Sequence, residues 1–187
     1  MFELLQRLKL ALPRVEAWID DLHADHRAES VLASELQFPR LADVFAPDLL
    51  NATRVAFVSD VPFPPVSTYG VPEFDAIAKM PMAAITFRDM YFVHQAHSSE
   101  GTHFHELVHV LQWRTLGVRP FLLTYALGIL QCGYERSPLE AMAFELQAQF
   151  ELGTSGRSIT EDVTQQALQA RDRAALVYRA NGLDVDA

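Results

Sequence analysis

Two histidines that enclose a glutamate in the pattern His-Glu-x-x-His constrain this chain more than any other feature of its sequence. They are His105 and His109, with Glu106 between them. Residues four apart are neighbours on a helix, so the motif predicts a helix that carries both imidazoles on one side. From Phe104, apolar residues recur at positions i, i+3, i+4 and i+7. This spacing favours a helix that packs into the core, with its histidines at the edge of a cleft.

Capping residues, prolines and glycines divide the C-terminal half of the chain into helices. Ser98 or Ser99 begins the motif helix, which runs to Leu116. The expected ranges of the helices that follow are 120–132, 138–152 and about 159–179. Ser158 and Glu161 can form a capping box at the start of the last one.

The N-terminal half predicts helices followed by short strands. Apolar residues at helical spacing predict one helix up to Leu12, and Pro13 then opens a second. A strand is expected at 54–58 and a proline-rich loop after it, and strands at 83–87 and 90–93 form a β-hairpin. We therefore expect one α+β domain over 1–187, with a helical part at 1–50, a catalytic core at 51–155 and a C-terminal helix in 156–187.

Charge and composition exclude several classes of partner. The chain has 15 basic and 24 acidic residues, a net charge of -9 and a pI near 5.1, which argues against binding nucleic acid or anionic lipid. Its longest uncharged segment, 120–134, is shorter than the roughly 20 residues of a membrane span. A single cysteine and an N-terminus without a signal-peptide pattern favour a cytoplasmic protein.

The chemistry of the motif is that of a zinc site. Two imidazoles on one side of a helix can bind a single ion, and Glu106 beside them can take a proton from water on that ion. A catalytic zinc needs a third protein ligand. Because no histidine follows His109, a downstream ligand must be a carboxylate or Cys132.

Glu140 is the best-placed third ligand. It lies in the first turn of the helix that begins at Ser137-Pro138, after a return helix long enough to bring the chain back beside the motif. Glu135 and Glu145 are substitutes. An alternative role for Glu140 is a capping box, in which its carboxylate binds only the backbone amide of Ser137.

These residues resemble the gluzincin branch of the zincin-like metallopeptidases, in particular its small bacterial members. The resemblance lies between Ala83 and Leu152 and rests on the motif, on Gln112-Trp113, and on the later Glu140-Ala141. It implies a zincin-like fold and a peptide or protein substrate. It also implies that the strand before the motif helix, Met90–His94, is a sheet edge that lies against the substrate.

The resemblance gives the site residues their roles. It implies that His105, His109 and Glu140 bind Zn²⁺ and that Glu106 is the general base of peptide hydrolysis. The chain departs from the family in one respect. Some gluzincins carry a second carboxylate four residues after the glutamate ligand, whereas this chain has Phe144 there.

Peptide hydrolysis also needs a donor for the oxygen that gains negative charge. Tyr134 is our candidate because it lies just before the proposed ligand helix, and the other possible donors are Tyr125, Tyr69, His103 and His97. Gln112 can bond a ligand or the chain facing the helix, and Trp113 is interpreted as packing.

Two other functions fit the same residues. One is a catalytically inactive zinc-binding module that regulates or binds a partner. The other is a metal-free helical interaction protein in which the motif is accidental. A zinc metallopeptidase is the primary hypothesis.

Overall fold

A small mixed sheet lies at the centre of the computed structural model, which describes residues 1–153 and 159–185. Its strands are ordered β1-β2-β4-β3. β1 (Val31–Leu32) pairs antiparallel with β2 (Arg54–Val58), and β2 pairs parallel with β4 (Met90–His94). β3 (Ala84–Phe87) pairs antiparallel with β4. The predicted α+β class and all three predicted strands are confirmed.

The position of β4 corrects the predicted sheet edge. β4 is hydrogen-bonded to β2 on one side and to β3 on the other, and its residues from Met90 to Val93 are at most 1% exposed. An almost continuous apolar run is typical of a strand covered on both faces. The edge strand beside the motif helix is therefore β3, and the prediction that Met90–His94 forms this edge is wrong.

The hairpin between β3 and β4 turns without a glycine. Arg88 adopts a φ of 56°, in the left-handed region that non-glycine residues seldom occupy. Its guanidinium Nη1 lies 2.5 Å from Asp20 Oδ1 on the N-terminal helix. This ion pair links the turn to that helix.

The N-terminal helix α1 (Phe2–His26) is continuous through Pro13, so the prediction of two helices is wrong. Pro13 is exposed, and a proline at this position removes one backbone hydrogen bond from the helix. Burial of apolar side chains in both halves of the helix offsets the free-energy cost of the proline. The earlier half contributes Leu5 and Leu8 to one hydrophobic cluster, and the later half contributes Val15 and Ile19 to another.

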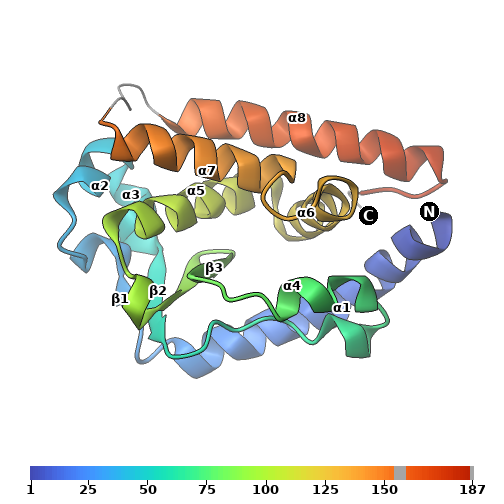
Figure 1. The fold of residues 1–187 in the computed structure, drawn as a ribbon, viewed down its shortest axis with the longest axis horizontal. Coiled ribbons are helices and arrows are strands. Elements are labelled where there is room, and N and C mark those ends of the chain that lie inside the picture. The colour runs from blue at the N-terminus through green and yellow to red at the C-terminus, as the bar shows by residue number, and fades with distance from the viewer. Residues whose placement is uncertain (154–158, 186–187) are drawn as a thin grey trace.

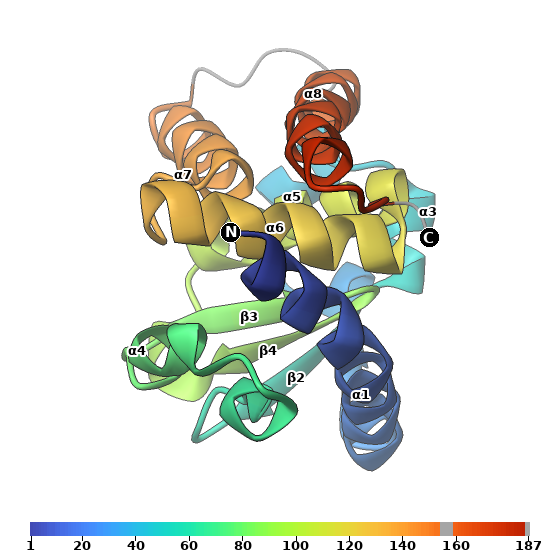
Figure 2. The same cartoon turned by 90° about the vertical axis from the view of Figure 1, so that its right-hand side faces the viewer.

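Four longer helices follow the sheet: α5 (Glu100–Leu116), α6 (Val118–Cys132), α7 (Pro138–Glu151) and α8 (Ile159–Ala180). In Figures 1 and 2, α7 and α8 form the top layer, α5 and α6 the next, and the sheet lies below them, while α1 runs obliquely from the level of α6 down past the sheet. The four predicted helices are confirmed, with α6 beginning two residues earlier than Pro120. The expected cap at Ser158 lies outside the described residues.

Shorter helices fill the connections. α2 (Pro39–Val44) and α3 (Pro47–Ala52) join β1 to β2, and α4 (Asp75–Ala78) follows the proline-rich segment. That segment contains two 3-10 turns, at Val66–Tyr69 and Pro72–Phe74, where we expected no regular structure. Within 1–153 and 159–185, no helix combines the length and apolar character that a membrane span requires.

Gly128 brings the start of α7 close to α6. A Cβ atom at this position would lie 2.8 Å from Cδ of Pro138 and 3.3 Å from Cβ of Ser137. Both of these atoms belong to short groups at the start of α7, two and three residues before Glu140. Any side chain at position 128 would therefore displace the start of α7.

We expect Gly128→Ala to lower the free energy of unfolding by about 1–3 kcal/mol, as overpacking does in other cores. Gly101→Ala is the matched control, because its Cβ atom would meet the carboxylate of Glu151, the far end of a flexible side chain. Urea unfolding measures both. A Gly128→Ala protein as stable as the Gly101→Ala protein would contradict this account of the α6–α7 contact.

Candidate metal centre

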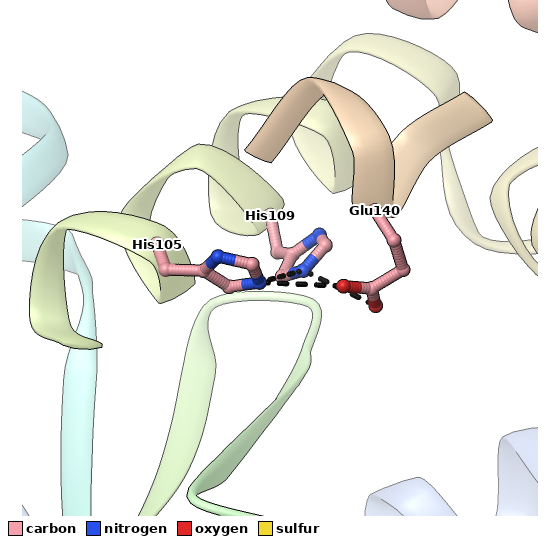
Figure 3. A group of neighbouring side chains, drawn as sticks. All are labelled: His105, His109 and Glu140. Atoms are coloured by element: carbon pink, nitrogen blue, oxygen red, sulfur yellow. Dashed lines mark hydrogen bonds and ion pairs between the residues drawn. The ribbon is translucent and has the colours of Figure 1, made fainter. Parts of the chain in front are cut away.

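His105, His109 and Glu140 meet where α5 and α7 lie side by side (Figure 3). The two Nε2 atoms are 3.0 Å apart. Nε2 of His105 lies 3.3 Å from Oε2 of Glu140, and Nε2 of His109 lies 3.4 Å from Oε1. One ligand atom from each residue falls within 4.8 Å of the others, and all three residues are buried. The predicted third residue therefore lies beside the two histidines of the motif.

Two glutamine amides fix which imidazole nitrogen carries hydrogen. Nδ1 of His109 is 2.8 Å from Oε1 of Gln112, whose Nε2 donates to the Leu139 carbonyl. Nδ1 of His105 is 3.1 Å from Oε1 of Gln147, whose Nε2 donates to Glu151. Since both amide oxygens face the rings, each Nδ1 is a donor and each Nε2 presents a lone pair to the centre.

The centre therefore contains acceptors that need a cation. Two Nε2 lone pairs and a carboxylate converge in a buried space. Among the described residues, Oε2 of Glu140 has the ion-pair contact to His105 but no hydrogen-bond partner of good geometry. Two imidazoles and one carboxylate are the protein ligands of many catalytic zinc sites, which leave a fourth position for water or substrate. This donor set fits Zn²⁺.

The charges of the cluster support the same interpretation. Burial by itself lowers the pKa of His109, but the carboxylates of Glu140 and Glu106 and the hydrogen bond to Gln112 together outweigh it and raise that pKa to about 9. Burial raises the pKa of Glu140, whereas the two histidines overcome it and hold that pKa well below its usual range. Without a metal, a proton on His109 balances the charge of Glu140, and a bound cation would replace that proton.

The alternatives for the third position lie elsewhere. Glu135, Glu145 and Cys132 are exposed, whereas Glu140 is 2% exposed. The capping-box alternative is also wrong, because the backbone amide of Ser137 donates to the carbonyl of Tyr134. The predicted cap by the Ser137 side chain is absent as well, since its hydroxyl makes no capping hydrogen bond to the described part of α7.

Glu106 is buried beside the histidines and accepts a hydrogen bond from the sheet. The Thr86 hydroxyl of β3 donates to its Oε2 atom at 2.6 Å. Burial raises the pKa of Glu106, and the neighbouring histidines and Thr86 oppose that rise. A buried carboxylate whose pKa is raised can accept a proton from water, as a general base must.

No protein-family model, curated protein or solved structure matches this chain. The donor atoms and their neighbours therefore carry the functional interpretation by themselves.

Only two of the five candidate oxyanion donors lie near the candidate metal centre. The Tyr125 hydroxyl donates to Oε1 of Glu140 at 2.5 Å, and Tyr134 lines a cavity together with Glu106 and Glu140. The other three lie away from this group. His103 is bonded between Tyr91 and Ser98, His97 is exposed beside His94 and Tyr69 packs under Arg14. A catalytic role of Tyr134 stays a prediction.

Phe144 stands where some gluzincins carry a second carboxylate, and Gln147 binds the histidine in its place. The Phe144 ring packs on the imidazole of His105 with 4.6 Å between centroids. Gln147, seven residues after Glu140 and therefore on the same face of α7, binds Nδ1 of this histidine instead. The sequence analysis missed both Gln147 and Thr86. The spacing of Gln147 from Glu140 was a signal that could have found it.

We expect the wild-type protein to bind about one zinc ion per chain and Glu140→Ala to lose it, because two imidazoles alone leave the centre a ligand short. Glu145→Ala, on the exposed face of the same helix, is the control and keeps its zinc. Elemental analysis of protein purified without chelator measures all three. Equal zinc in the wild type and Glu140→Ala would remove Glu140 from the site.

Gln147→Leu should weaken zinc affinity by about 10- to 100-fold, since the amide that orients His105 is lost while the ligand remains. Gln149→Leu, exposed on the same helix, is expected to bind zinc as the wild type does. Competition with a chromophoric chelator gives both affinities. If Gln147→Leu binds as tightly as Gln149→Leu, the contact between Gln147 and His105 has no part in holding the metal.

Proposed function

We propose that this protein is a zinc-dependent metallopeptidase with a zincin-like fold. The observation that carries the proposal is the convergence of His105, His109 and Glu140, with Glu106 held beside them by Thr86. A structural zinc site closes all four positions with protein ligands, whereas this cluster offers three and opens onto a cleft. Three ligands, an adjacent buried carboxylate and an opening to solvent favour catalysis.

Zn²⁺, when bound by the three residues, would supply a Lewis acid that polarises a carbonyl group and lowers the pKa of water. The chain supplies the proton transfers. Glu106 would accept a proton from the attacking water and deliver it to the leaving amine. Thr86 keeps the carboxylate of Glu106 in place, and its hydrogen bond leaves the other carboxylate oxygen for the water.

Tyr134 is the candidate donor to the oxygen that gains charge. Burial and the nearby Glu140 carboxylate both raise the pKa of its phenol, so the hydroxyl remains protonated at neutral pH. Tyr125 is already engaged as a donor to Glu140. Tyr134 lines the cleft together with His105 and Glu106, whereas Tyr125 does not, and we therefore propose Tyr134 as the donor that faces a substrate.

The cleft supports a peptide as the substrate. It has a volume of about 250 Å³ and runs beside Ala83 and Ala84, at the start of the edge strand β3. Backbone groups on a sheet edge can pair with an extended chain of almost any sequence. We propose that the substrate backbone lies along β3, in place of the predicted Met90–His94.

We expect Glu106→Gln to keep its zinc and to lose about 10²- to 10⁴-fold in the rate of peptide hydrolysis, because the amide cannot take the proton. Glu145→Gln is the matched control and retains the activity. A quenched-fluorescent peptide library measures the rates, and elemental analysis measures the zinc. Full activity of Glu106→Gln overturns the assigned base. A zinc-loaded wild type that cleaves no peptide would favour the inactive zinc-binding module instead.

A further inference from the structure

A second cavity adjoins the cleft at Glu106, which lines both. It has a volume of about 120 Å³ and is lined by residues of α1, α6, β3 and the proline-rich segment. Its walls are almost entirely apolar. Representative lining residues are Leu12, Val71, Phe74, Leu123, Ala126 and Ile129.

This cavity is continuous with the candidate metal centre. Glu106, His109 and Glu140 form part of its lining, and Tyr134, Met82 and Ala84 line both this cavity and the open cleft. A group held in the cavity would therefore touch the reacting centre, while the rest of the same molecule extends into the cleft.

Side-chain contacts join two walls of the cavity, α1 and the proline-rich segment. Arg7 on α1 donates to the Gly70 carbonyl at 2.6 Å and pairs with Glu73. Arg14 donates to the Thr68 carbonyl at 3.0 Å. These contacts fasten the proline-rich segment to α1, which is typical of a largely preformed pocket.

The size and lining of the cavity select its occupant. An engineered cavity of about 150 Å³ with apolar walls binds benzene, so the present space suits one branched aliphatic or aromatic group. The titratable acidic and histidine side chains in its lining are Glu106, His109 and Glu140, which all belong to the candidate metal centre. An anionic occupant would lose its hydration and lie beside the carboxylates of Glu106 and Glu140, and away from that end the apolar walls offer a cationic group no partner.

We propose that this cavity binds a leucine- or phenylalanine-sized apolar side chain of the substrate, on a residue that flanks the scissile bond. The inference rests on the proposed function and adds the class of peptide that the enzyme prefers. Specificity then comes from α1, α6 and the proline-rich segment, and the edge strand contributes affinity with little selectivity.

Fluorobenzene tests the cavity without any catalytic step. ¹⁹F NMR titration of zinc-free and zinc-loaded protein is expected to show saturable binding. Ala126→Phe places a ring inside the cavity and should weaken that binding at least about tenfold. Ala17→Phe, on the exposed face of α1, is the control and leaves it unchanged. Thermal unfolding and zinc content establish that each variant is folded.

Peptide cleavage then tests the occupant. With all other positions fixed, a peptide with leucine or phenylalanine beside the scissile bond should exceed its alanine counterpart in kcat/KM by about 10- to 200-fold. Ala126→Phe should reduce this preference, whereas Ala17→Phe preserves it. Cleavage without such a preference, or no saturable fluorobenzene binding by the wild type, overturns the inference.

The two measurements test the cavity and the metallopeptidase activity independently. Fluorobenzene binding that is lost in Ala126→Phe, together with no hydrolysis of any peptide, would keep the apolar site and reject the metallopeptidase. Hydrolysis that depends on Glu106 but ignores the size of the flanking residue would keep the metallopeptidase and reject the role of the cavity.

Discussion

The lone pairs that converge between α5 and α7 are the constraint on which the rest of the site depends. Two imidazoles and a carboxylate without a cation between them repel one another and lose their hydration. Glutamine amides nevertheless fix both imidazole rings through their Nδ1 atoms, and the Tyr125 hydroxyl binds the carboxylate of Glu140. Such restraint is costly unless a positive charge occupies the centre, either as a proton or as a metal ion.

Local signals in the sequence were enough to predict most helices and strands. Ser99 caps α5 through its hydroxyl and Gly117 ends that helix with a positive φ, so side-chain and backbone chemistry near each end determine the boundaries. Strand order is different. The parallel pairing of β2 with β4 joins segments separated by the proline-rich region and β3, and no local pattern specifies which strand becomes the edge. The continuity of α1 through Pro13 likewise depends on burial by distant residues.

The residues of the candidate site likewise fall into those that the sequence predicted and those that it did not. The motif and the Ser137-Pro138 start of a later helix were enough to select His105, His109 and Glu140 from the sequence, because periodicity fixes side-chain direction within each helix. Thr86 could not be found by this reasoning. Its contact with Glu106 crosses from sheet to helix, and a single threonine in a strand pattern carries no sign of such a partner.

The continuous helix α1 has one further consequence. Its first half forms a wall of the apolar cavity, and its second half covers the sheet, where Trp18 packs edge-on against Phe87. The helix therefore belongs to both hydrophobic clusters. A change that reshapes the cavity by moving α1 also disturbs the sheet that holds Thr86. Substrate preference and global stability are thereby linked through one helix, so selection on either property alters the other.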